Sequence, residues 1–260
     1  MIRVLKDLEA IPASLAVPPT TGPARTTHRA RERIISESIY PQNNKSTDNR
    51  YKIADIKEAL SAIYNKKCAF CEQRIEQWHV EHYRPKSIYY WLAFSWDNLL
   101  FACPTCNQYK RDNFRITGIP AIYDPDHLDK INTISTTYDA VEKPDLINPE
   151  REDPESLLNF REDGFIDSSD SRCKYTISTC CKIDRPSLND ARKKIWDDFV
   201  KDLRSEILEG ATREEILGNV SVLLRKFNRD AQNDTGNEFL AFRRFAIRNW
   251  LNSKIKELTA

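Results

Sequence analysis

The sequence predicts a mainly helical α+β protein with a metal-bound centre and a helical C-terminal region. Two observations carry this prediction. Four of the seven cysteines form two Cys-x-x-Cys pairs near the middle of the 260-residue chain, a pattern typical of metal sites. From residue 185 onward, apolar residues recur every three or four positions, which is the period of an α-helix. A chain of this length has room for one large domain or two modest ones.

Composition and charge narrow the functional classes. Hydrophobic residues make up 40% of the chain and charged residues 30%, as in soluble globular proteins. Lys and Arg number 40 against 39 Asp and Glu, a formal net charge of +1, so phosphate binding would need a local basic patch. The N-terminal residues lack an apolar stretch followed by a cleavage site, and no apolar run reaches the ~18 residues of a membrane span. We therefore expect a cytoplasmic protein without membrane contact.

Four segments with different patterns follow one another along the chain. Two helices, predicted over residues 28–40 and 51–64, precede the cysteines. A linker of loops and short strands follows them, in which Asp163-Gly164 predicts a hairpin turn and residues 173–183 predict short strands and loops. Helices fill the last segment. The expected boundaries are residues 1–66, 67–120, 121–186 and 187–260.

The last segment predicts three helices. Ser187 is the expected N-cap of the first helix, and Gly210 is its expected end. Thr212 opens a capping box for the second helix, which we expect to reach about residue 227. Residues 237–258 form the third.

The two cysteine pairs predict a closed structural zinc site. Each two-residue gap lets both sulfurs reach one tetrahedral Zn²⁺ from a tight turn, and in a reducing cytosol such pairs indicate metal binding rather than disulfides. Because cysteine occupies all four positions, no coordination position stays open for catalysis. The four expected zinc ligands are Cys68, Cys71, Cys103 and Cys106. We expect the remaining thiols to be buried and structural, namely Cys173, Cys180 and Cys181.

The chain between the two pairs carries residues suited to acid–base and phosphate chemistry. Glu81 and His82 stand side by side at the end of an apparent strand, where adjacent side chains share a site only if the strand bends or ends. Asn98 precedes the second pair. Asn107 lies on the first turn of a predicted helix, whose N-terminus favours a phosphate. Each residue alone also has an ordinary explanation as a surface, cap or turn residue. We assign no role to the other histidines, His28, His79 and His127.

The order and spacing of these residues resemble a known family. The stretch "CAFCEQRI…VEHYRPK…WDNLLFACPTCNQYKRDNF" resembles HNH endonucleases, which have a ββα-metal fold and often two flanking Cys-x-x-Cys pairs. Further segments, "IPASL", "LINPEREDPESLLNFREDGFI" and "YTISTCCKIDRPSLNDARKKIW", are similar to the HNH subunit of Septu-type anti-phage systems, which also accompanies some retrons. The resemblance extends to about Trp196, and the last two helices show nothing specific to the family.

The resemblance implies a role for each matched position. His82 would be the general base that takes a proton from the attacking water. Glu81 and Asn107 would hold one divalent ion, Mg²⁺ or Mn²⁺, since both ions prefer oxygen ligands. Asn98 would fix the loop and the orientation of His82. The expected contacts to backbone phosphates are Arg84, Lys86 and Lys110. The sequence departs from the common acid–histidine pair in having Glu rather than Asp at position 81.

Three functions remain open at this level. The first is a metal-dependent HNH endonuclease that hydrolyses DNA and is held inactive until an SMC- or ABC-like ATPase partner releases it. The C-terminal helices, with Arg243, Arg244 and Arg248, would either dock this partner or simply cover the core. The second is an HNH nuclease that cleaves RNA such as tRNA. The third is a non-catalytic zinc adaptor that binds nucleic acid, in which the cysteines would be essential and the HNH residues dispensable.

Overall fold

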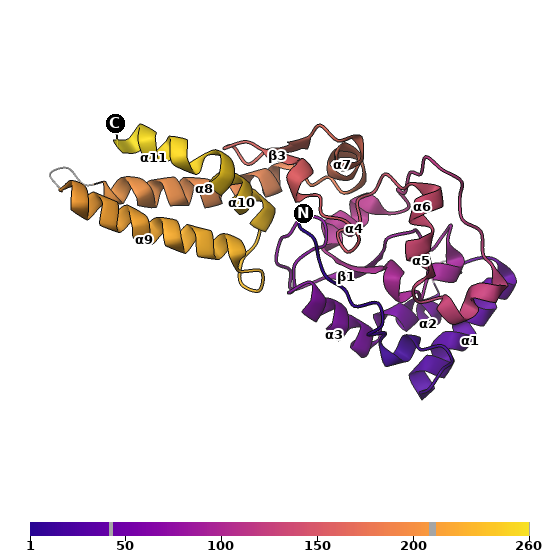
Figure 1. Ribbon diagram of the computed structural model, residues 1–260. Helices are drawn as coiled ribbons and strands as arrows, with labels where there is room; N and C mark the ends of the chain where they lie inside the picture. The colour runs from indigo at the N-terminus through magenta and orange to yellow at the C-terminus, as the bar shows by residue number, and fades with distance from the viewer. Residues whose placement is uncertain (42–43, 208–211, 260) are drawn as a thin grey trace.

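In the computed structural model, which describes residues 1–41, 44–207 and 212–259, a rounded N-terminal part carries an arm of long helices (Figure 1). The N-terminus lies where the two parts meet, and the C-terminus lies near the far end of the arm. Short 3₁₀ turns connect the elements of the rounded part. These elements are α1 (Gly22–Glu37), α2 (Lys45–Asp48), α3 (Ala54–Ile63), β1 (His79–His82), β2 (Leu99–Ala102), α4 (Pro104–Lys110), α5 (Ile134–Thr137) and α6 (Asp139–Glu142).

The first helix begins earlier than the predicted range of 28–40. α1 starts at Gly22 because the hydroxyl of Thr21 accepts a hydrogen bond from the backbone N–H of Ala24 (3.1 Å) and Pro23 suits the first helical turn. The second predicted helix is α3, within the expected residues.

β1 and β2 form an antiparallel pair, and α4 follows β2 almost directly. Glu81 lies opposite Leu100, and His82 lies opposite Leu99. All four residues of β2 are buried, so this strand forms part of the core and holds β1 in place. A small ββα unit therefore lies inside a mainly helical chain, which confirms the predicted fold class.

The linker contains the predicted hairpin, built from β3 (Leu158–Phe160) and β4 (Ile166–Ser168). Gly164 has a φ of 80°, a region that disfavours other residues. An added Cβ at this position would lie 1.9 Å from the backbone oxygen of Asn189. The turn therefore requires glycine both for its backbone conformation and for its close packing on the arm.

The strands predicted over residues 173–183 are absent, and this prediction was wrong. The chain instead forms α7 (Ser171–Lys174) and a π-helical turn, η7 (Tyr175–Cys180). The β-branched residues of this stretch favour strands locally. Ile177 and Cys180 are nevertheless completely buried, so tertiary packing outweighs the local preference.

The arm consists of α8 (Pro186–Glu206), α9 (Arg213–Gln232), α10 (Leu240–Asn249) and α11 (Leu251–Thr259). The N-cap of α8 is Arg185 rather than Ser187. The predicted capping box of Thr212 opens α9, although the helix runs past residue 227. The third predicted helix divides into α10 and α11 at Trp250. The expected end of α8 at Gly210 lies outside the described residues.

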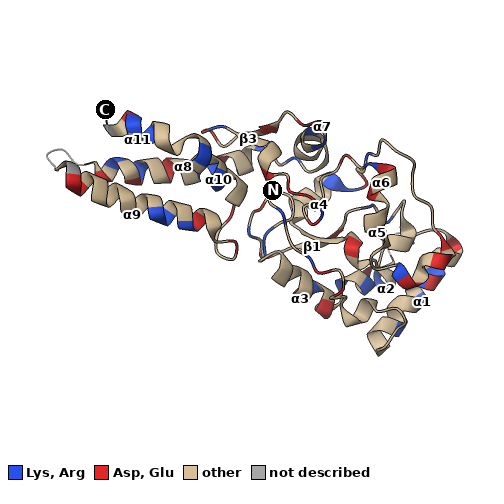
Figure 2. Ribbon diagram, in the orientation of Figure 1, with Lys and Arg blue, Asp and Glu red and all other residues tan. Residues whose placement is uncertain are grey.

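Aromatic side chains hold the arm together. The rings of Phe199 and Phe227 lie 4.3 Å apart, and those of Trp196 and Trp250 lie 5.3 Å apart, so α8, α9 and the α10–α11 junction share one core. Residues of both charge signs occur along its helices (Figure 2). None of the described helices has the length and apolar character needed to cross a membrane.

Candidate active site and zinc centre

The four cysteines of the two pairs come together beside the ββα unit. Cys68, Cys71, Cys103 and Cys106 are all buried, and their sulfur atoms lie within 4.8 Å of one another. The sulfurs of Cys71 and Cys103 are 3.9 Å apart. A tetrahedral Zn²⁺ with Zn–S bonds of about 2.3 Å places its sulfurs about 3.8 Å apart. The cluster therefore fits a structural zinc ion, as the sequence predicted.

Arg185 also contacts the cluster, which sequence reasoning missed. Its guanidinium Nη1 donates to the sulfur of Cys106 (3.5 Å), and Nη2 lies 4.0 Å from the sulfur of Cys103. Four thiolates carry more negative charge than one Zn²⁺ neutralises, so a nearby guanidinium stabilises the cluster. Because Arg185 is the N-cap of α8, this contact joins the zinc centre to the base of the arm.

A cleft of about 720 Å³ opens beside β1 and α4, and both Glu81 and His82 line it. The Nε2 atom of His82 is 3.0 Å from the backbone oxygen of Ala93. A carbonyl only accepts hydrogen bonds, so Nε2 carries the proton and Nδ1 carries the lone pair. The ring of Tyr51 packs against the imidazole at 4.6 Å. Burial lowers the pKa of His82 to about 3, so the imidazole is neutral at neutral pH and Nδ1 holds a free lone pair.

A chain of polar contacts surrounds the carboxylate of Glu81. One oxygen accepts from the backbone N–H of His82 (2.8 Å) and lies 3.2 Å from the ammonium of Lys110. The other oxygen accepts from the side-chain amide of Asn107 (2.5 Å), and the amide oxygen of Asn107 is 3.1 Å from Nδ1 of His79. Burial raises the pKa of Glu81, and Lys110 opposes that rise. The structure therefore places Glu81, Asn107 and His79 together.

His79 was predicted to have no role, yet it lies in this cluster and lines the cleft. The signal that would have found it is the alternation of a strand. Residues two apart on a strand point to the same face, so His79 accompanies Glu81 on β1.

Asn98 stabilises the loop that follows β1. Its side-chain oxygen accepts from the backbone N–H of Arg84 (2.8 Å), and its amide donates to the backbone oxygens of Arg84 (3.0 Å) and Leu92 (3.2 Å). Asn98 is completely buried, so all of its contacts are internal. It therefore spans the start and the end of the loop that precedes Ala93, the residue whose oxygen orients His82.

Two of the three residues expected to contact phosphates are unavailable for that role. Arg84 and Lys110 are completely buried, and each has a carboxylate partner inside the protein. The sequence could not predict this, because burial is decided by packing. Lys86 does line the cleft, although it also donates to Asp48 (2.9 Å) and to the hydroxyl of Tyr51 (2.8 Å).

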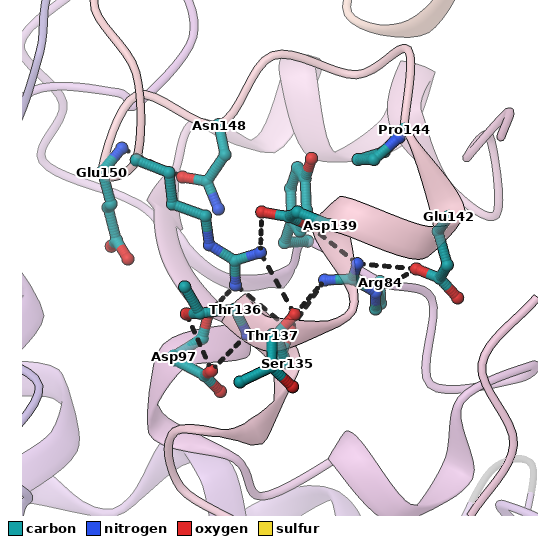
Figure 3. Close-up of polar contacts among 12 residues, drawn as sticks. Arg84, Asp97, Ser135, Thr136, Thr137, Asp139, Glu142, Pro144, Asn148 and Glu150 are labelled. Carbon is teal, nitrogen blue, oxygen red and sulfur yellow. Dashed lines mark hydrogen bonds and ion pairs between the residues drawn. The ribbon is translucent and has the colours of Figure 1, made fainter. Parts of the chain in front are cut away.

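Arg84 instead connects the loop after β1 to the helices α5 and α6. Figure 3 shows its guanidinium between Glu142 and Ser135, with Asp139 beside it. Nε donates to Glu142 (2.7 Å), Nη1 donates to the hydroxyl and backbone oxygen of Ser135, and Nη2 donates to Asp139 (2.8 Å). Arg151 shares Asp139 from the other side (2.7 Å). This buried network supports the loop that carries Ala93, the residue whose oxygen contacts His82.

Removing this guanidinium is expected to destabilise the protein strongly. Arg84→Ala leaves the carboxylate of Glu142 buried without its ion-pair partner, and loss of one member of a buried pair costs about 3–5 kcal/mol. The free energy of unfolding, measured by urea denaturation, checks this expectation. Arg248→Ala is the matched control, since Arg248 pairs with Glu155 at 2.7 Å while half exposed, and such pairs contribute about 1 kcal/mol or less. Equal losses in the two variants would contradict a structural role for Arg84.

Other cations line the cleft in place of Arg84 and Lys110. Lys52, Lys57 and Arg111 are exposed and face the cleft that contains His82. Each is outside the HNH motif or at its edge, so the motif alone gave no reason to select them. The cleft thus combines a neutral imidazole, an acid–amide pair and several cations.

Comparison with known proteins defines the class of the central unit. Residues 68–113 match the model of the HNH endonuclease family. β1, β2, α4 and the four clustered cysteines all fall within this range. The chain therefore contains an HNH endonuclease domain.

Over a longer stretch, the chain is homologous to Septu protein PtuB. It is 28% identical over 206 residues to Septu protein PtuB of Bacillus mycoides (strain KBAB4), and the match covers 73% of this chain and 64% of that protein. A Septu protein PtuB of Bacillus thuringiensis is 42% identical over 59 residues, which cover 21% of this chain and 23% of that protein. The chain thus spans less than two thirds of the curated relatives that it matches.

Proposed function

We propose that this chain is a metal-dependent HNH endonuclease that hydrolyses phosphodiester bonds in DNA as the effector of an anti-phage defence complex. The observation that carries the proposal is the cleft. It brings the neutral imidazole of His82, the Glu81–Asn107 pair and several cations together in one place. Similarity to Septu protein PtuB supports the role in defence.

His82 is the proposed general base. The contact of Nε2 with Ala93 fixes the tautomer and leaves the lone pair on Nδ1. Nδ1 would take the proton from a water as that water attacks the phosphorus atom. Asn98, through its bonds across the loop, would position His82 without contacting the substrate.

Glu81 and Asn107 would hold the divalent ion, and their oxygens suit a hard cation. An ion bound there would stabilise the negative charge that develops on the phosphate and on the leaving oxygen. Lys52, Lys57 and Arg111 would contact the backbone phosphates in place of the buried Arg84 and Lys110.

His79 is a further proposed ligand of this ion, because its Nδ1 is 3.1 Å from the amide oxygen of Asn107. An imidazole ligand favours Mn²⁺ over Mg²⁺, which prefers oxygen. In the zinc-loaded protein, His79→Ala is expected to weaken Mn²⁺ binding by about 10-fold or more, as with other residues that support metal sites. Titration calorimetry gives the affinity, and pulsed EPR of bound Mn²⁺ detects an imidazole nitrogen.

The matched control for this experiment is His127→Ala. His127 is a partly exposed histidine in the turn at Pro125–Lys130, close to Asp124 (3.5 Å). This variant is expected to keep both the Mn²⁺ affinity and the nitrogen signal. An unchanged nitrogen signal in His79→Ala would exclude His79 as a ligand.

A cleavage assay tests the proposed function. Supercoiled plasmid and total tRNA are incubated with the protein and Mg²⁺ or Mn²⁺, with and without a partner ATPase of the SMC or ABC type. A water nucleophile needs no 2′-hydroxyl, so plasmid cleavage that is absent in His82→Ala supports the proposal. Cleavage of tRNA alone would favour the RNA nuclease. Equal inactivity of wild type and variant with the ATPase present would favour the zinc adaptor.

The proposed contact with the ATPase lies on the arm, although not through all of its arginines. Arg244 and Arg248 both bind Glu155 (2.8 and 2.7 Å), so they connect α10 to the turn before β3. Arg243 donates to the backbone oxygen of Glu238 (3.1 Å). The contacts of Arg244 and Arg248 favour a role in holding α10 to the linker, whereas the contact of Arg243 lies within the arm.

A further inference from the structure

A second cleft, of about 520 Å³, adjoins the cleft that contains His82. Lys57 and Trp78 line both clefts, so the two meet at these side chains. From there the second cleft follows α3 to Asn65 and Lys66, just after its end, and reaches Thr235 in the loop between α9 and α10. Figure 1 shows α3 on the side of the rounded part that is nearest this loop. Together the two clefts form one path that extends well beyond the residues proposed to act in catalysis.

The walls of this second cleft carry more positive than negative side chains. Lys57, Lys66 and Arg74 line it, together with a single acid, Glu58. Within the described part of the chain, none of these three cations forms an ion pair with a carboxylate. By contrast, Lys194 on α8 pairs with Asp198 one turn further along.

Two other acids lie close to this cleft, and both have partners. The carboxylate of Glu238 accepts from the backbone N–H of Arg74. The carboxylate of Asp234 forms an ion pair with Lys67 and accepts from the side chain of Asn65 (3.1 Å). Arg74 donates to the backbone oxygen of Thr235, a contact that positions its guanidinium without neutralising it. Trp78 stacks on Phe101 at 4.1 Å, so its ring forms a fixed wall at the point where the clefts meet.

We propose that the second cleft binds the backbone phosphates of the substrate strand on one side of the scissile bond. A strand that passes His82 and continues along α3 would meet Lys57 and then Lys66 and Arg74. Repeated negative charges on a flexible chain are the ligand that such spaced cations recognise. This inference rests on the proposed nuclease function and adds that the enzyme requires a strand longer than the first cleft.

The test compares two double variants in a protein that cannot cleave. The parent is full-length, zinc-loaded His82→Ala without divalent ion. One double variant carries Lys57→Gln and Lys66→Asn. Glutamine maintains α3, and asparagine tolerates the positive φ of 57° at position 66. The control carries Lys174→Gln and Lys226→Gln, which remove two exposed charges remote from both clefts.

Binding of fluorescent DNA strands to these proteins is measured over a range of salt concentrations. For a long strand, the cleft variant is expected to bind at least about 10-fold more weakly. Its slope of log affinity against log salt should fall by about 1 for each phosphate that the variant no longer neutralises. For a trinucleotide, the reduction in affinity should be smaller, because only Lys57 contributes to the first cleft. The control should match the parent. RNA strands of the same sequence show whether the path distinguishes the two backbones.

Equal affinity of the cleft variant and the control for the long strand would overturn the inference, as would the absence of measurable binding by the parent. Failure of the proposed nuclease function can be distinguished from failure of the proposed binding path. If the wild type cleaves no nucleic acid but the cleft variant loses long-strand binding, the nuclease proposal fails and the binding path stands. If the wild type cleaves DNA and both double variants bind equally, only the binding path fails.

Discussion

His82→Ala is expected to lower the rate of phosphodiester cleavage by about 10²–10⁴-fold, the usual contribution of a general base. The expectation follows from the position of the imidazole. Its Nε2 is engaged by Ala93, and its neutral ring lines the cleft beside Glu81. The initial rate of plasmid cleavage under conditions in which the wild type is active measures the effect.

Two controls accompany this variant, one that checks its folding and one that checks the activity of another histidine variant. Removing the buried ring of His82 also removes its packing against Tyr51, so stability is expected to fall by a few kcal/mol or less. Zinc content and circular dichroism should match those of the wild type. His28→Ala, which changes a histidine on α1, should retain full activity. A folded, zinc-loaded His82→Ala protein with wild-type activity would exclude His82 as the base.

Cys106→Ser is expected to release the zinc and to unfold the region around the ββα unit. Binding of a structural zinc contributes about 10–16 kcal/mol in small zinc domains, which equals or exceeds the total stability of a typical domain, about 5–15 kcal/mol. Elemental analysis of the purified protein gives the zinc content, and thermal unfolding gives the loss of stability. A strong chelator should produce the same change in the wild type.

Cys173→Ala is the matched control for the zinc experiment. Cys173 is also completely buried, but it lies on α7 and outside the cluster of four sulfurs. This variant should retain the zinc and lose only the modest stability expected of a small change in the core. Retention of zinc by Cys106→Ser together with a wild-type unfolding temperature would show that the cluster is not a structural zinc site.

The sequence predicted those features that depend on spacing along the chain. The cysteine pairs and the capping box of Thr212 are local patterns, and the ββα unit was implied by the resemblance to HNH endonucleases. The structure contains all three. Features that depend on packing were missed. Nothing near Arg84 in the sequence shows that α5 and α6 supply its partners some fifty residues later. The π-helical turn η7 arises for the same reason, since its strand-favouring residues become helical only against the core.

His79 is an intermediate case. Its strand was correctly predicted, and the alternation of that strand already placed it on the same face as Glu81. A single histidine on a strand, with no second indication of function, was too little reason to assign His79 a role in the site. Arg185, in contrast, is separated from its nearest cysteine partner by 79 positions, so only the folded chain reveals the contact.

The order of residues on α4 has a practical consequence for purified samples. Cys106 and Asn107 are consecutive. One peptide bond therefore joins a residue of the zinc cluster to the residue whose amide is proposed to bind the catalytic ion. A molecule without its zinc therefore also loses the position of Asn107. The active fraction of any preparation should equal its zinc occupancy, and specific activity is meaningful only per mole of bound zinc.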